Sequence, residues 1–106
     1  MKVYPYKEVE VLVKSEVVSS AKQIWTVKSK EYFDQHGDRG SCIVSDGIYI
    51  LYKPKRCRNP QKLMLIPSRE VAFCQGSLHY EYYKDEVVAF LQENNIDCSY
   101  DYGRMD

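Results

Sequence analysis

A cluster of basic residues between positions 53 and 62 is the part of this sequence whose residue types could do chemistry. The cluster consists of Lys53, Lys55, Arg56, Arg58 and Lys62, and Pro54 and Pro60 interrupt regular structure within it. Arginine can bind a phosphate through two parallel hydrogen bonds, whereas lysine supplies a point charge. Tyr49 and Tyr52 precede the cluster and could stack on a nucleic-acid base. The cluster therefore predicts a loop that binds phosphates, nucleic acid or an acidic protein partner.

The distribution of charge offers a second interpretation of this loop. The chain has 15 basic and 15 acidic residues, and hence no net charge. Residues 47–80 hold six basic residues and one acidic residue, whereas residues 81–106 hold two basic and seven acidic residues. A nucleic-acid-binding domain is usually basic overall. The neutral total therefore favours a loop that is solvated, or one that is neutralised by the acidic C-terminal region or by a second copy of the chain.

A tyrosine-rich, acidic C-terminal region is the second candidate surface. The residues that we predict to contact a protein partner are Tyr80, Tyr82, Tyr100, Tyr102 and Asp101. The chain contains ten tyrosines, which is too many to bury with every hydroxyl hydrogen-bonded in so small a core. Exposed tyrosines with acidic neighbours are typical of protein-binding faces. The alternative is that these rings cover the rim of a sheet.

The sequence carries no recognisable catalytic or metal-binding motif. Asp34, His36 and Asp38 alternate in a predicted loop, but such triplets arise by chance in polar segments. The cysteines are Cys42, Cys57, Cys74 and Cys98, and no two of them have the spacing of a zinc half-site. No pattern around a cysteine, serine or histidine indicates a nucleophile. We therefore predict no catalytic residue, no metal, no cofactor and no enzymatic activity.

Two elements are expected in the first third of the chain. Alternating valines predict a strand over Val3–Val13, with Pro5 at its edge or at a bend. Ser15 is a suitable cap, so a helix is predicted from Glu16. One apolar face of this helix would be made by Val17, Val18, Ala21, Ile24 and Trp25. The end of the helix stays open, because Gly37 would suit a stop but Gln23–Tyr32 could instead form a strand.

A hairpin is the strongest local signal in the middle of the chain. Asp46-Gly47 predicts a two-residue turn that pairs Cys42–Ser45 with Ile48–Leu51. Both faces of this hairpin are apolar, so it should lie at the centre of the fold or against another subunit. The later elements predicted are strands over Leu63–Ile66, Val71–Cys74 and Leu78–Tyr83, a helix over Lys84–Asn94 with Asp85 and Glu86 in its first turn, and a last strand over Ile96–Tyr102.

These elements sum to a single α+β domain over residues 1–106. We expect a mainly antiparallel sheet of about five to seven strands with one or two helices packed on it. No apolar run approaches the length that spans a bilayer, and the first residues lack the apolar core of a secretion signal. The expected location is therefore the cytoplasm.

The function expected from the sequence is that of a small non-enzymatic binding or regulatory protein. It would act through protein–protein contacts. Chains of this size and composition are common among phage and viral accessory proteins, so an accessory or inhibitor protein of that kind is one expectation. The alternatives are a module that binds nucleic acid or phosphate through residues 53–62, and a small enzyme. The expected partner is another protein or a second copy of the chain, with nucleic acid as the alternative partner and no membrane.

Overall fold

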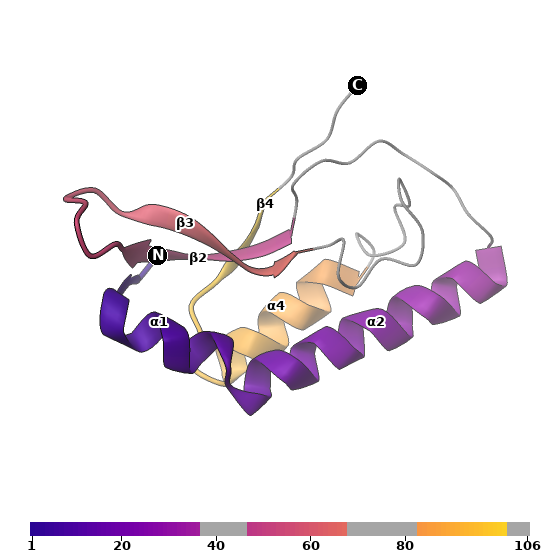
Figure 1. Cartoon of the computed structure of the whole chain (residues 1–106). Helices are drawn as coiled ribbons and strands as arrows, with labels where there is room; N and C mark the ends of the chain where they lie inside the picture. The colour runs from indigo at the N-terminus through magenta and orange to yellow at the C-terminus, as the bar shows by residue number, and fades with distance from the viewer. Residues whose placement is uncertain (37–46, 68–82, 102–106) are drawn as a thin grey trace, which may run out of the picture.

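The computed structural model describes residues 1–36, 47–67 and 83–101 and shows a sheet with helices on one face. The helices of these ranges are α1 (Tyr6–Val13), α2 (Glu16–His36) and α4 (Lys84–Glu93). The strands are β1 (Val3–Pro5), β2 (Gly47–Lys53), β3 (Gln61–Pro67) and β4 (Ser99–Asp101). The three helices lie on the same side of the sheet (Figure 1). The prediction of an α+β architecture holds, but the described residues form three helices, so the prediction of one or two helices is wrong.

The sheet is mixed and has four strands, so the prediction of a mainly antiparallel sheet of five to seven strands is wrong. β2 lies at the centre, with β3 antiparallel along one edge. Its other edge is shared by two short strands. β4 pairs antiparallel with the first half of β2, and β1 pairs parallel with the second half. The parallel pair arises because β1 leads into a helix, which carries the chain away from the sheet before β2 begins.

The segment Val3–Val13 is a strand only at its start, which corrects the prediction for this segment. Pro5 has extended backbone angles, and α1 begins at the next residue. The alternating valines misled the prediction because Val9 and Leu12 also lie three residues apart, on one helical face. These two side chains are half-buried against the core, whereas Val11 is 73% exposed. In this segment, the packing of one helical face against the core therefore outweighs the alternation of valines that favours a strand.

The helix predicted from Glu16 is confirmed, and it continues to His36 as α2. The predicted apolar face packs inward, with Val18, Ala21 and Trp25 fully buried. The alternative strand over residues 23–32 is wrong. Thr26, a residue that weakens helices, is accommodated because its Oγ1 donates a hydrogen bond to the Lys22 carbonyl oxygen at 2.8 Å. Asp34 and His36 of the proposed metal triplet lie on this helix, and Asp38 lies outside the described residues.

Replacing Ser15 by Ala is expected to lower the free energy of unfolding by about 0.5–1 kcal/mol. The backbone N–H of Val18 donates a hydrogen bond to Ser15 Oγ at 3.4 Å, and this bond satisfies one of the open donors at the start of α2. Urea denaturation followed by circular dichroism measures the change. Ser19→Ala is the matched control, because Ser19 is an exposed residue inside the same helix. An equal loss in both variants would contradict a capping role.

The predicted hairpin around Asp46-Gly47 also needs correction. Its first strand, Cys42–Ser45, lies outside the described residues. In its second strand, Tyr49 pairs with Met64 of β3 and with Ser99 of β4, so both neighbouring positions are filled and the predicted register is wrong. The hairpin that the chain does form joins β2 to β3, and the basic loop is its turn.

Gly47 allows β2 to start close to β3. Its φ of +154° is a backbone conformation that residues with a side chain rarely adopt. A Cβ at this position would contact the carbonyl oxygen of Ile66 and would lie 2.9 Å from Met64 Sδ and 3.0 Å from Pro67 Cα. Glycine is therefore required here for the close approach of two backbones as well as for the backbone angle.

Replacing Gly47 by Ala is expected to destabilise the protein by roughly 2 kcal/mol, because the new methyl group forces the two strands apart. Thermal and urea unfolding measure the loss. Ser99→Ala on the neighbouring strand is a suitable control, since it removes a hydroxyl without adding atoms. Equal stability of the Gly47→Ala variant and the unmodified protein would show that β3 can move away at no cost.

The two faces of β2 differ in burial. Ile48 and Ile50 face the helices and are fully buried, whereas Tyr49 and Leu51 on the opposite face are half-buried. Among the elements of the described ranges, no helix covers that opposite face (Figure 1). The described residues therefore cover one face of β2, and contact of the other face with another subunit stays a prediction.

The helix predicted over residues 84–94 is confirmed as α4. Val87 and Leu91 are buried, and Asp85 and Glu86 occupy the first turn, where they favour the helix dipole. Asn95 follows the helix with a φ of 67°, the left-handed conformation expected after a helix end. The last strand is also present as β4, within the predicted range. The predicted strand Val71–Cys74 and all but the last residue of Leu78–Tyr83 lie outside the described residues. No helix in those described residues is both long and apolar enough to cross a membrane.

Candidate functional site: the basic hairpin tip

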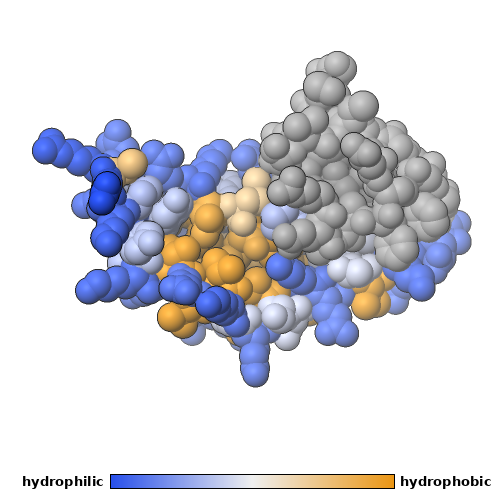
Figure 2. All heavy atoms as spheres, in the orientation of Figure 1, coloured by the Kyte–Doolittle hydropathy of each residue, from blue (hydrophilic) through white to orange (hydrophobic). Residues whose placement is uncertain are grey.

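The basic residues predicted as a binding site form the tip of the β2–β3 hairpin. Tyr52 pairs with Gln61, so the residues between them make the turn. Lys53, Lys55, Arg56 and Arg58 in this turn are all exposed. The tip projects from one end of the sheet (Figure 1). Figure 2 shows hydrophilic side chains gathered at this end, whereas apolar side chains gather between the sheet and the helices. The hairpin therefore presents several cations to solvent at the end of a rigid element.

Lys62 differs from the other four cations, because it is already engaged within the protein. Its Nζ lies 3.6 Å from Asp101 Oδ2 and 4.7 Å from the centroid of the Tyr49 ring. The predicted neutralisation of the basic loop by the acidic C-terminal region thus applies to this residue. Within residues 1–36, 47–67 and 83–101, no acidic side chain forms an ion pair with the other four cations.

The geometry of the tip concentrates like charge. Pro54 and Pro60 lack the N–H group that a strand ladder needs, so the strands end and the cations lie on one short loop. Cys57 N donates to the Pro54 carbonyl oxygen at 3.4 Å, which closes one turn inside the loop. Charges this close lie within the Debye length of about 10 Å at 0.1 M salt, so they repel one another. A polyanionic partner would relieve this repulsion on binding.

The tyrosine-rich candidate surface is only partly described, and its described members make contacts inside the protein. The Tyr100 ring lies edge-on to Trp25, with centroids 6.3 Å apart and planes at 68°. Lys84 Nζ lies 5.4 Å from the centre of the Tyr100 ring, and Asp101 is bound to Lys62. Tyr80, Tyr82 and Tyr102 lie outside the described residues. A protein-binding role for this surface stays a prediction.

Sequence reasoning missed two residues near the tip, Tyr6 and Lys7. Pro5 pairs with Lys53, so the first turn of α1 starts beside the strand that leads into the basic loop. Tyr6 is 55% exposed, and Lys7 is also exposed. The signal that could have placed them here is the parallel pairing of β1 with β2. That pairing joins residues almost 50 positions apart, and no local pattern announces it.

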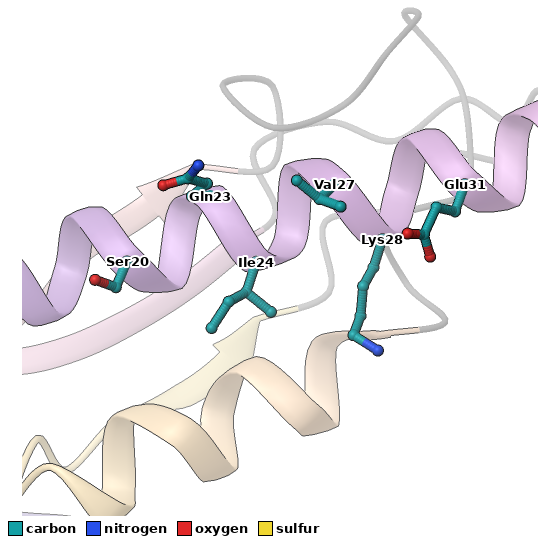
Figure 3. Close-up of a pocket in the computed structure, with 6 residues that line it drawn as sticks. All are labelled: Ser20, Gln23, Ile24, Val27, Lys28 and Glu31. Carbon is teal, nitrogen blue, oxygen red and sulfur yellow. The ribbon is translucent and has the colours of Figure 1, made fainter.

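A surface hollow of about 370 Å³ runs along α2 and is a second place where a ligand could bind. It is lined by Ser20, Gln23, Ile24, Val27, Lys28 and Glu31 (Figure 3). Lys28 Nζ is 3.0 Å from Glu86 Oε2, and this hydrogen bond, together with the attraction of the two charges, raises the pKa of Lys28. The lysine is thereby held as a cation and serves to join α2 to α4.

The thiols described by the structure differ in exposure. Cys57 is exposed in the basic loop, whereas Cys98 is buried next to β4. Burial, and to a lesser extent the charge of Asp97, raises the pKa of the Cys98 thiol to about 11. Cys98 is therefore an unreactive core residue at neutral pH. Cys42 and Cys74 lie outside the described residues, as does His79. No group of three histidine, cysteine, aspartate or glutamate side chains within the described ranges is arranged to hold a metal ion.

The raised pKa of Cys98 predicts a loss of stability in alkali. Between the ordinary thiol value of 9.0 and about 11, the unfolded chain releases the thiol proton while the folded chain retains it. The free energy of unfolding should therefore fall as pH rises through this window, by up to about 3 kcal/mol. Urea titrations at several pH values, compared with Cys98→Ala, isolate this effect because other groups titrate equally in both proteins. A constant difference between the two proteins across the window would refute it.

Comparisons of this chain with protein-family models, with curated proteins and with solved structures found no match.

Proposed function

We propose that this protein is a small non-enzymatic binding protein that attaches to the phosphates of nucleic acid through the tip of its β2–β3 hairpin. The observation that carries the proposal is the exposure of Lys53, Lys55, Arg56 and Arg58, with no acidic partner for any of them in the described part of the chain. Lys62, by contrast, is engaged by Asp101. Four cations on one projecting loop provide a sequence-independent contact for a phosphate backbone.

The zero net charge of the chain limits the strength of this contact rather than its location. Long-range attraction depends on the summed field of the protein, which is weak when basic and acidic residues are equal in number. Contacts at the tip depend on local charge, since screening removes distant charges beyond the Debye length. The expected binding is therefore local, with a few phosphates contacted at once. Arg56 and Arg58 contribute most to its geometry, because each can bind a phosphate through two hydrogen bonds.

Fluorescence anisotropy with labelled DNA and RNA oligonucleotides at low salt tests the proposal. The variant carries Arg56→Gln and Arg58→Gln. The matched control carries Lys22→Gln and Lys30→Gln, which removes the same charge from α2, away from the tip. We expect the tip variant to lose binding by an order of magnitude or more and the control to keep it. Equal binding by both variants, or no binding by the unmodified protein, would refute a nucleic-acid function of the tip.

A protein partner is a second candidate, favoured by exposed valines on α1. Val11 is 73% exposed and Val13 is 43% exposed. Burial of these apolar side chains against a partner would be favourable. This observation supports the sequence-based expectation of protein–protein contacts, including contacts with a second copy of the chain. Capture from native lysate with and without nuclease separates the two candidates. A partner that survives nuclease and is lost on Val11→Ser would favour the protein candidate.

A further inference from the structure

An aromatic side chain and a hollow lie at the same end of the molecule as the basic tip. The register of β1 and β2 places Pro5 opposite Lys53. The first residue of α1 and the first residue after β2 therefore follow two residues that are paired with each other. Adjacent strands are about 4.8 Å apart, and Tyr6 and Pro54 are the next residues in each chain segment. Figure 1 shows the start of α1 and the β2–β3 loop at the same end of the sheet.

The hollow beside Tyr6 has a volume of about 560 Å³ and is lined by Tyr6, Lys7, Val9 and Glu10. This volume falls within the range of small-molecule sites. Its lining combines one aromatic ring, an aliphatic side chain and two charged groups. Tyr6 is 55% exposed, so its ring is accessible to a stacking partner. The hollow is therefore suited to a flat ring that can stack on tyrosine.

We propose that the nucleic acid bound by the tip is single-stranded, and that one of its unpaired bases stacks on Tyr6 in this hollow. The inference rests on the proposed function, because the phosphates on either side of that base would contact the hairpin tip. Single-strand binding proteins combine a cationic track for the backbone with aromatic rings for the bases. Here the two parts come from different elements, β2–β3 and α1.

The charges around the hollow separate the base from the backbone. Glu10 lies on the hollow and is bound to Lys14, with Oε1 and Nζ 3.2 Å apart. Glu8 is a further exposed carboxylate on the same helix. These two carboxylates are offset by Lys7 and Lys14, so the hollow has no net charge and suits an uncharged base, while the phosphates follow the cationic tip. A duplex holds its bases paired and stacked, and so cannot supply that base without unpairing.

Anisotropy titrations with a labelled single strand of about 12 nucleotides and with the matching duplex test this inference. The variants are Tyr6→Leu, which removes the ring, and Tyr6→Phe, which keeps it. We expect the unmodified protein to prefer the single strand. Tyr6→Leu should weaken single-strand binding by roughly 5- to 150-fold, and Tyr6→Phe should change it by no more than about 2-fold. Tyr6 is an exposed side chain, so all three proteins should show the same circular dichroism spectrum.

Failure of this inference can be told apart from failure of the proposed function. If Tyr6→Leu binds the single strand as well as the unmodified protein while Arg56→Gln with Arg58→Gln does not, the tip function stands and the stacking site is refuted. Equal affinity for the duplex and the single strand also refutes the stacking site. If neither nucleic acid binds and an acidic protein is captured through the tip instead, both proposals are overturned.

Discussion

Replacing Lys53, Lys55, Arg56 and Arg58 together by Gln is expected to remove most of the salt dependence of nucleic-acid binding. Each phosphate contact to a single strand adds about 0.7 to the slope of log affinity against log salt. Four contacts therefore add about 2.8, which corresponds to a roughly 50-fold loss of affinity between about 50 and 200 mM salt. The quadruple variant should lose this part of the response. It should also bind the nucleic acid more weakly at low salt.

The quadruple variant should fold as well as the unmodified protein. None of the four side chains forms an ion pair in the described part of the chain, and their mutual repulsion disappears in the variant. Thermal unfolding should thus show an unchanged or slightly raised midpoint. Anisotropy titrations at four or five salt concentrations give the slope for each protein. A slope that does not change in the variant would place the phosphate contacts elsewhere on the molecule.

Replacing Trp25 by Ala is expected to lower the free energy of unfolding by about 3–5 kcal/mol. Trp25 is fully buried, and its ring meets Tyr100 edge-on, so it joins the middle of α2 to the last strand. Truncation removes the buried apolar surface of the indole ring. It leaves a cavity between α2 and β4 that these two elements can close only in part. Because small domains are stable by only about 5–15 kcal/mol, the variant should be close to unfolding at room temperature.

Urea denaturation followed by circular dichroism measures this loss, since Trp25 is the only tryptophan and its fluorescence disappears in the variant. Trp25→Phe is the control, because it keeps an aromatic ring beside Tyr100 and should cost considerably less than the alanine variant. A mild effect of both substitutions would mean that α2 is not anchored to the sheet through this side chain.

Elements with local signals could be predicted from the sequence. α2 was located by Ser15 and by apolar residues at helical spacing, and α4 by its acidic first turn. α1 was not, because Val9, Val11 and Val13 alternate as in a strand while Val9 and Leu12 also have the spacing of one helical face. The sheet was not either, since β2 takes its neighbours from both ends of the chain. Turn chemistry at Asp46-Gly47 describes only local preference, and Tyr49 pairs instead with distant strands.

The candidate site was predicted in part for the same reason. The basic loop is visible as composition, and its place between two strands follows from its prolines. Lys62 contacts Asp101, whereas the neighbouring cations do not. This difference depends on the pairing of β2 with β3 and β4. Tyr6 joins the same end of the molecule through the pairing of β1 with β2. Contacts across the sheet thus decide which cations remain for a partner.

The two ends of the described chain meet at one edge of β2, and this arrangement delays folding. Asp97 N–H donates a hydrogen bond to the Tyr4 hydroxyl at 2.8 Å, across 93 positions of sequence. Lys2 N–H donates to the Asp97 carboxylate across 95 positions. Contacts between distant residues form slowly because a long loop must close first. During synthesis, Lys2 and Tyr4 therefore emerge early, and their hydrogen bonds to Asp97 can form only after α4 has been made.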